Sequence, residues 1–278
     1  HMIDFSAPDL TAHPPRSVRV RLGGFAHLPR LIDKARATAA GKSGAYKYDC
    51  PMDKNFFAFT GITADAFLAA HGLTPGQFLC CIPKLRYTPY WLIRNSPKDE
   101  TRHARNEAMK AADHAPLLEA INAVVRETNL KILLCPEDKT QMTVGKEQLY
   151  DHLSAEVKRR VVWREKFWLT DEALSTYRRS AGLFGHEQHS PIMCIGAGIP
   201  AIVCRWAEQT TKGDMWRTIG LGDWLFNLDV EADRRRVAPA VLAMAKDPAA
   251  ARTKAAQARS LVENYQQKTM AVLARQFA

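Results

Sequence analysis

The chain has 278 residues, of which 46% are hydrophobic and 24% are charged, so it can bury one large core or two smaller ones. No apolar run is long enough to cross a bilayer, and we therefore expect no membrane span. The formal net charge of +10 predicts an acidic partner, but the basic residues are spread along the chain without a nucleic-acid-binding signature, so nucleic acid is not the expected partner.

The start of the chain differs in pattern from the rest, and we expect a small, mainly helical N-terminal module over residues 3–70. Residues 18–22 form a weak strand-like run, and residues 28–40 show the apolar spacing of an amphipathic helix. Phenylalanines at positions 56, 57 and 59 predict a packed core, and a second helix is expected over residues 63–70.

From residue 71 onward, apolar strand-like runs alternate with helical patterns, and we expect a second domain over residues 71–278. Strands are predicted near 77–83, 131–136, 160–164, 182–186, 201–205 and 224–228. Helices are predicted near 103–111, 114–128, 144–152, 171–180, 190–197, 213–219, 232–246 and 249–274. Strands dense in Val, Ile, Leu and Cys, separated by helices, predict an α/β fold: a Rossmann-like parallel sheet with helices on both faces.

The six cysteines form no CxxC pair, and most of them lie in apolar, strand-like runs. Free, buried thiols in a reducing compartment explain this pattern better than disulfides or zinc ligands do. The histidines do not show the spacing of a metal-binding motif either. We therefore expect a cytoplasmic protein with no metal and no cofactor.

The segment from Gly182 to Cys204 predicts a buried strand, a sharp turn, a short helix and a second buried strand. Ser190 is expected to cap this helix, with Pro191 in its first turn. Glu187 and His189 then lie where a parallel strand ends and a helix begins, which is where open α/β sheets bind ligands. His189 is a candidate general acid or base, and Glu187 a candidate partner for it or for a substrate hydroxyl. The alternative is a capped turn without a ligand.

Two basic residues are candidates for holding an anion. Arg86 follows an apolar strand and precedes an aromatic run over residues 87–91, which could line the face of a sugar or a base. Lys212 is expected at a helix start, where its ammonium and nearby amide groups could share a phosphate, with Gln209 and Thr210 completing that loop. The alternative for both is a surface side chain without a ligand.

Residues from about 71 to 278 resemble the C-terminal half of the polysaccharide pyruvyl transferase family, whose fold is similar to the GT-B glycosyltransferases. The matching stretches are Ile82-Pro-Lys-Leu-Arg86, Glu187-Gln-His-Ser-Pro191, Ala197-Gly-Ile-Pro200 and Glu208-Gln-Thr-Thr-Lys212. The resemblance implies a transferase of cell-surface polysaccharide biosynthesis, which moves a pyruvyl or glycosyl group from an anionic small-molecule donor to a carbohydrate acceptor. The histidine of the family's donor-site motif matches His189, and Arg86 and Lys212 match its basic positions. From the residues themselves we expect His189 and Glu187 to be catalytic, and Arg86, Ser190, Gln209, Thr210 and Lys212 to bind the donor. Residues 8–62 resemble the start of a small uncharacterised bacterial domain family, which implies no activity.

The chain departs from the transferase family in two ways. The family carries an Arg-x-His motif before a helix, and here the histidine matches at His189 while Glu187 occupies the arginine position. Because a carboxylate repels phosphoenolpyruvate, a nucleotide sugar is a competing donor. The first 70 residues are also too few for a second Rossmann-like half, so the N-terminal module or another subunit, as in a homo-oligomer, would complete a cleft. A non-catalytic binding or assembly module on a truncated transferase fold is the alternative.

Overall fold

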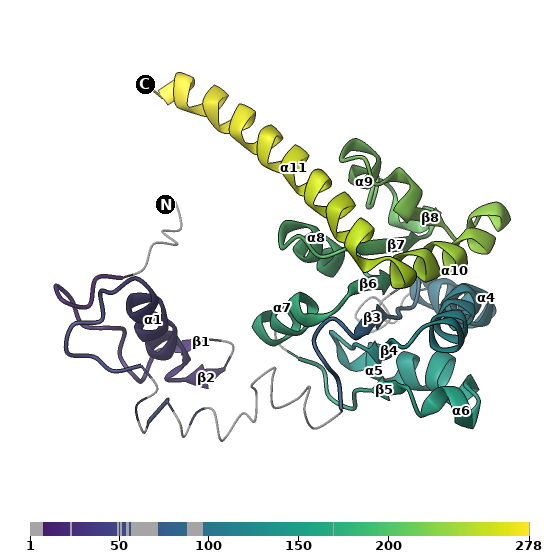
Figure 1. The fold of residues 1–278 in the computed structure, drawn as a ribbon, viewed down its shortest axis with the longest axis horizontal. Coiled ribbons are helices and arrows are strands. Elements are labelled where there is room, and N and C mark those ends of the chain that lie inside the picture. The colour runs from purple at the N-terminus through teal and green to yellow at the C-terminus, as the bar shows by residue number, and fades with distance from the viewer. Residues whose placement is uncertain are drawn as a thin grey trace. The chain divides into compact units, whose positions relative to one another are not determined.

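The structure is a computed structural model that describes residues 8–22, 24–48, 50, 52–53, 56, 72–87, 97–168 and 170–277. The chain divides into two compact units, His1–Phe67 and Leu68–Ala278 (Figure 1). No helix in the described ranges combines the length and the apolar character that a membrane span requires.

In the first unit, a short hairpin precedes one amphipathic helix. Strands β1 (Arg21–Leu22) and β2 (Phe25–Ala26) pair antiparallel, and helix α1 (Leu28–Ala39) follows directly, close to the predicted range. Gly41 ends this helix in the left-handed region, with φ of 69°, which a glycine adopts without steric cost. The predicted helix over 63–70 and the phenylalanines at 57 and 59 lie outside the described residues.

The second unit is built on a parallel sheet with the strand order β5-β4-β3-β6-β7-β8. Its strands are β3 (Phe78–Ile82), β4 (Lys131–Leu134), β5 (Val161–Trp163), β6 (Gly182–Gly185), β7 (Ala201–Arg205) and β8 (Leu225–Asn227). All neighbouring strands pair parallel, and every residue of the central strands β3 and β6 is buried. The predicted α/β fold with a Rossmann-like parallel sheet is thus confirmed.

The strand order reverses direction between β3 and β6. The chain moves outward from β3 through β4 to β5, then crosses back to place β6 on the other side of β3 and moves outward again. Ile82 at the end of β3 pairs with Gly185 at the end of β6, so the two strands end side by side. This is the topological switch point of the sheet, where ligands bind in open α/β folds.

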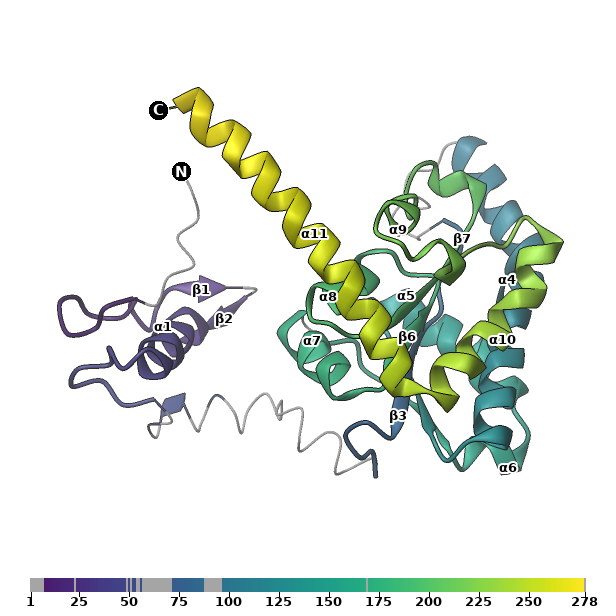
Figure 2. The same ribbon diagram turned by 45° about the horizontal axis from the view of Figure 1, so that its top comes forward.

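Helices cover both faces of the sheet. Helix α4 (Pro97–Glu127) packs on α10 (Glu231–Lys246) on one face, and α7 (Thr170–Arg179) packs on α8 (His189–Gly196) on the other (Figure 2). The shorter helices are α5 (Lys139–Val144), α6 (Ala155–Lys158) and α9 (Met215–Thr218), with single turns at Gly145–Leu149, Tyr150–His152, Ala207–Gln209 and Gly222–Trp224.

Two helix predictions differ from the structure. The helices expected at 103–111 and 114–128 are one continuous helix, α4, which accommodates Pro116 in its interior. The helix expected at 144–152 is instead the end of α5 followed by a π-helical turn and a 3₁₀ turn. Both departures reflect tertiary packing, which overrides the local helix signals.

The last helix, α11 (Pro248–Phe277), is only partly packed on its unit. Ala251, Ala255 and Ala258 are buried, whereas Tyr265 and Val272 are about half exposed, at 48% and 53%. Figures 1 and 2 both show the C-terminal half of this helix projecting beyond the sheet.

Candidate functional site

A group of polar side chains gathers at the switch point, where β3, β4 and β6 end. Lys84 follows β3, Glu137 follows β4, and Glu187, His189 and Ser190 follow β6. These strands are neighbours in the sheet and run parallel, so the residues that follow them meet at one edge. We call these five residues the switch-point cluster.

Glu187 is the centre of the switch-point cluster and is only 5% exposed. Its Oε1 accepts the backbone N–H of Gln188 at 2.8 Å and that of His189 at 3.2 Å, so the carboxylate caps helix α8. Its Oε2 lies 3.3 Å from Lys84 Nζ and accepts from Gln141 Nε2 at 3.4 Å. Burial alone would raise the pKa of Glu187, but Lys84 and the two amides lower it below the ordinary value. The carboxylate is therefore ionised at neutral pH.

His189 pairs with Glu187 and also faces solvent. Its Nδ1 lies 3.1 Å from Glu187 Oε1, while its side chain is 73% exposed. A carboxylate at this distance favours the tautomer with the proton on Nδ1, which leaves the lone pair on Nε2. The arrangement is an exposed imidazole oriented by a buried, ionised carboxylate, which is suited to moving a proton to or from a bound molecule.

Ser190 does not have the position predicted for it. The helix begins one residue earlier than expected, at His189, because the Glu187 carboxylate satisfies the first amides. Ser190 is buried in the first turn, and its hydroxyl donates to Glu137 Oε1, which also accepts from the Tyr177 hydroxyl at 2.7 Å. Burial raises the pKa of Glu137 above its ordinary value. The Ser190 hydroxyl is therefore bonded to a carboxylate of the protein and is not free to bind a donor. Glu137 was not among the residues predicted from the sequence, where only its position shortly after a strand could have indicated it.

Arg86 is the second residue whose placement differs from the expectation. Its side chain has no exposed surface, and three carboxylates hold its guanidinium: Asp113 at 2.8 Å, Glu208 at 2.9 Å and Asp229 at 2.7 Å. Burial would lower the pKa of Arg86, but these carboxylates raise it above its ordinary value. We call these four residues the Arg86 cluster. The Arg86 cluster connects the segment after β3 to α4 and to the loops that follow β7 and β8. The N–H donors of Arg86 bind carboxylates of the protein and are not available to a ligand.

The loop after β7 holds the remaining predicted donor-binding residues. Gln209 accepts the backbone N–H of Trp206 at 3.0 Å through its own side chain, and the Thr210 carbonyl accepts from Arg205. Thr210 has φ of 54°, a left-handed conformation that is strained for a β-branched residue. Lys212 is exposed, but α9 begins three residues later, at Met215, so the ammonium does not sit at a helix start as predicted. The aromatic residues at 88–91 lie outside the described residues.

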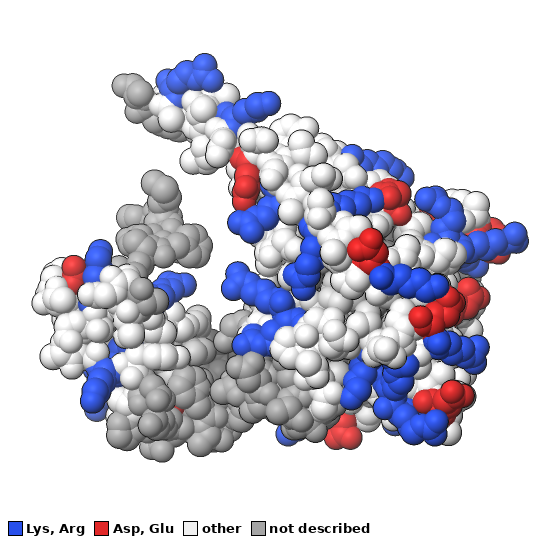
Figure 3. All heavy atoms as spheres, viewed as in Figure 1, with Lys and Arg blue, Asp and Glu red and all other residues white. Residues whose placement is uncertain are grey.

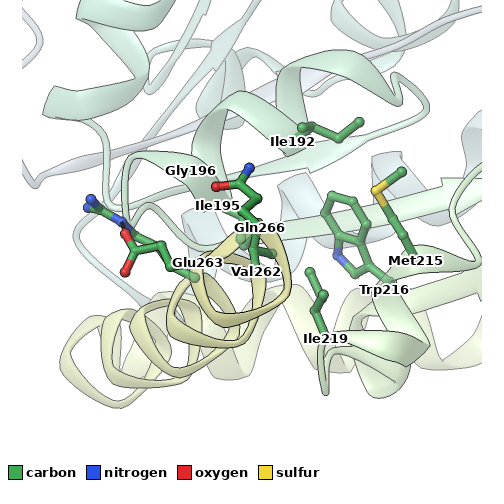
Figure 4. A pocket seen from close by; sticks show the side chains of 10 residues that line it. Ile192, Ile195, Gly196, Met215, Trp216, Ile219, Val262, Glu263 and Gln266 are labelled. Carbon is green, nitrogen blue, oxygen red and sulfur yellow. Dashed lines mark hydrogen bonds and ion pairs between the residues drawn. The ribbon is translucent and has the colours of Figure 1, made fainter. Parts of the chain in front are cut away.

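An apolar pocket of about 400 Å³ lies between α8, α9 and α11 (Figure 4). Its lining residues are Ile192, Ile195, Gly196, Met215, Trp216, Ile219, Arg259, Val262, Glu263 and Gln266. Arg259 and Glu263 pair with each other along α11 at 2.8 Å. No residue of the switch-point cluster lines this pocket, so the two features are separate, although both use helix α8.

All six cysteines are free, and five of them are buried while Cys50 is half-buried. Within the described ranges, no group of three metal-ligating side chains comes together. Figure 3 shows lysine and arginine side chains spread over the visible face with acidic side chains among them, instead of one continuous basic patch.

Comparisons with known proteins give two similarities. The family model of DUF5069, a domain of unknown function, matches residues 12–73, a stretch that overlaps the region resembling a small uncharacterised bacterial domain family. Among solved structures, the chain is similar to the spinosyn rhamnosyltransferase SpnG, with 13% sequence identity and a TM-score of 0.37. That match covers 69% of this chain and 45% of SpnG, so the chain spans less than half of that protein. No curated protein matches the chain. The pyruvyl transferase family is not shown by these comparisons, and that resemblance stays a prediction.

Proposed function

We propose that the parallel-sheet unit catalyses group transfer to a carbohydrate hydroxyl, with His189 as the general base. In this reaction Nε2 of His189 takes the proton of the acceptor hydroxyl while the acceptor oxygen forms a bond to the donor's sugar carbon and the anionic leaving group departs. The observation that carries the proposal is the exposed His189 ring, held at 3.1 Å by a buried, ionised Glu187 at the switch point of the sheet. Positioned bases of this kind contribute roughly 10²- to 10⁴-fold in rate.

The charges at this edge favour a nucleotide sugar over phosphoenolpyruvate as the donor. Glu187 already supplies a negative charge to the start of α8, so a carboxylate or phosphate brought there meets repulsion instead of free amides. Lys84 is the nearest cation, but it is paired with Glu187 at 3.3 Å. In a nucleotide sugar the phosphates lie apart from the transferred sugar, and the exposed Lys212 on the loop after β7 is available for them.

The test is donor binding followed by transfer. Thermal melting is measured with phosphoenolpyruvate and with a panel of nucleotide sugars, because a ligand that binds the folded state raises the melting temperature. We expect one nucleotide sugar to raise it, and His189→Ala to keep that shift while transfer falls by roughly 10²- to 10⁴-fold. His152→Ala is the matched control, because His152 is an exposed histidine in the crossover between β4 and β5, outside the switch-point cluster. Equal transfer by His189→Ala and His152→Ala would contradict the proposal.

A second candidate, a non-catalytic binding or assembly module, is favoured by a different observation. Arg86 and Ser190, both expected at a donor site, are bound by carboxylates of the protein itself. This candidate predicts that no donor of the panel changes the melting temperature. It also predicts that His189→Ala leaves every measured property unchanged.

A further inference from the structure

The N-terminal unit contains a cluster of titratable side chains that the proposed transfer does not use. His27, Lys34, Cys50 and Asp53 are linked by hydrogen bonds that all involve Asp53 or Lys34, and we call them the Lys34 cluster. Lys34 Nζ lies 2.7 Å from both carboxylate oxygens of Asp53 and donates to Cys50 Sγ at 3.2 Å. All four residues belong to the stretch that DUF5069 matches, for which no function is assigned.

The charged pair in this cluster is withdrawn from solvent. The side chain of Lys34 is 3% exposed and that of Asp53 is 0% exposed. The ammonium also donates to the Lys47 carbonyl oxygen at 3.1 Å, so four acceptor atoms surround Lys34 Nζ and hold it in one orientation beside the sulfur. Burying an ion pair in so small a unit costs free energy that an apolar pair would not, which makes a role beyond packing worth seeking.

His27 also binds Asp53 and shares its Oδ1 atom with Lys34. Its Nε2 lies 2.7 Å from Asp53 Oδ1, and its backbone adopts φ of 70°, a left-handed conformation that is uncommon outside glycine. The residue is more than nine-tenths buried, and its Nδ1 has no hydrogen-bond partner among the described parts of the chain. A buried ring nitrogen without a partner leaves a polar atom that a bound molecule can satisfy.

Cys50 differs from the five other cysteines in both exposure and charge. It is half-buried, and the backbone N–H of Asp53 together with the Lys34 ammonium lowers the pKa of its thiol below the ordinary value, against the opposing effects of burial and of the Asp53 carboxylate. Burial raises the pKa of Cys81, Cys135 and Cys194 well above the ordinary value. These buried cysteines should react slowly, so they serve as internal controls for the reactivity of Cys50.

We propose that Cys50 is a peroxide-reactive thiolate, with Lys34 stabilising the negative sulfur and with Asp53 and His27 positioning Lys34. The sulfur attacks one oxygen of the peroxide, so that an S–O bond forms as the O–O bond breaks. The sulfur loses two electrons and becomes a sulfenic acid, while the peroxide is reduced and leaves as hydroxide, or as alkoxide from an organic peroxide. The substrate class is thus a small peroxide that reaches the sulfur from solvent.

The first experiment separates reactivity from mere exposure. The folded full-length chain is pulsed with iodoacetamide across a range of pH, and alkylation of each cysteine is followed by mass spectrometry beside N-acetylcysteine in the same buffer. We expect Cys50 to reach half its maximal rate at a lower pH than N-acetylcysteine, and at pH 7 to react at least about ten-fold faster than Cys80 or Cys204. A pH midpoint equal to that of N-acetylcysteine would overturn the proposal, because it would show an ordinary exposed thiol.

The second experiment tests the oxidation itself. After treatment with hydrogen peroxide, dimedone should label Cys50 in the wild-type chain and label none of the buried cysteines. Cys50→Ser removes the label and should leave the melting temperature and any donor-induced shift unchanged, so this result is independent of the proposed transfer. Absence of dimedone label on wild-type Cys50 would contradict the proposal.

Variants of Lys34 test the source of the activation. Lys34→Met should move the alkylation midpoint of Cys50 up toward that of N-acetylcysteine but not all the way, because the backbone N–H of Asp53 still favours the thiolate. Lys34→Arg, which keeps the charge, should move the midpoint less. Because Lys34 is buried, circular dichroism must first show that each variant is folded. If Lys34→Met does not fold, the comparison of Lys34→Arg with the wild type decides, and a folded Lys34→Met with an unchanged midpoint would refute the role of the ammonium.

Discussion

Lys84 and Arg86 stand two residues apart after the same strand, and both bind carboxylates, yet they sit in different surroundings. The Lys84 side chain is 16% exposed and pairs with Glu187, which also holds the exposed His189. The Arg86 side chain is fully buried and is held by three carboxylates from different parts of the unit. A cation whose donors are all used inside the protein cross-links elements of the fold, whereas Lys84 balances a carboxylate beside an exposed ring and so belongs to the site that we propose.

A chain of ring contacts begins at the Arg86 cluster and adds to this difference. The guanidinium lies 5.5 Å from the Trp206 ring, and the His186 ring lies 4.8 Å from that of Trp206 and 4.9 Å from that of His114. Burial lowers the pKa of His186 well below its ordinary value and that of His114 to about 4. Both histidines are therefore neutral at pH 7.

The largest effect is expected when Arg86 is removed. Arg86→Met leaves Asp113, Glu208 and Asp229 without their shared cation, and breaking a buried ion network costs about 3–5 kcal/mol of the free energy of unfolding. Urea unfolding followed by circular dichroism measures this loss. Arg105→Met is the control, since the Arg105 side chain is 45% exposed, pairs with the same Glu208 at 3.2 Å, and should cost less than about 1 kcal/mol. Equal losses in the two variants would mean that the buried Arg86 stabilises the fold no more than the half-exposed Arg105 does.

Mild acid is expected to destabilise the fold through His114, which follows Asp113 of the Arg86 cluster in the chain. The folded-state pKa of His114, about 4, lies below the ordinary value of 6.5, so the unfolded chain binds the proton first. The contribution of neutral His114 to the free energy of unfolding is thus fully present above pH 6.5, and about 3 kcal/mol of it is lost as the pH drops from 6.5 toward 4. Urea unfolding at several pH values measures the slope, which His114→Gln should reduce. A slope that is the same in the variant would mean that His114 contributes nothing to it.

Glu187 is expected to give an intermediate loss. Glu187→Ala removes the cap of α8 and leaves Lys84 unpaired, which should lower the free energy of unfolding by about 1–3 kcal/mol. Glu187→Gln keeps an oxygen that can accept the two amides, so its loss should be smaller. Because the folded-state pKa of Glu187 is lowered, its stabilisation is present above its unfolded-state pKa and is lost as the pH falls. Chemical denaturation at pH 7 compares the two variants, and a larger loss in Glu187→Gln would argue against the capping role.

The smallest effect on stability is expected at His189. With 73% of its side chain exposed, His189→Ala should change the free energy of unfolding by less than about 0.5 kcal/mol. The same substitution is the one expected to reduce transfer by roughly 10²- to 10⁴-fold, so it separates folding from function most clearly. A loss above 1 kcal/mol in the same denaturation assay would mean that the ring supports the fold.

The architecture could be predicted from the sequence because it rests on local patterns. Each strand is a short apolar run bounded by helical segments, and its position can be found without knowing its neighbours. The site depends instead on contacts between residues far apart in the chain. Asp113 and Glu208 are 27 and 122 positions from Arg86, and nothing in the local sequence announces that pairing. For the same reason Ser190 is a plausible cap by type, and only the fold shows that Glu187 takes that place.

The partial packing of helix α11 determines where the helix unfolds locally. The turns around Ala251, Ala255 and Ala258 are packed on the unit and serve as the helix nucleus. The turns beyond Leu261 can therefore form by extending an existing helix, without a new nucleation step. The side chains of these turns are mostly exposed, so little packing protects their backbone hydrogen bonds. Amide hydrogen exchange should therefore be fast near residue 275 and become progressively slower toward residue 255. The C-terminal turns of α11 can fray and reform many times while the parallel sheet stays intact.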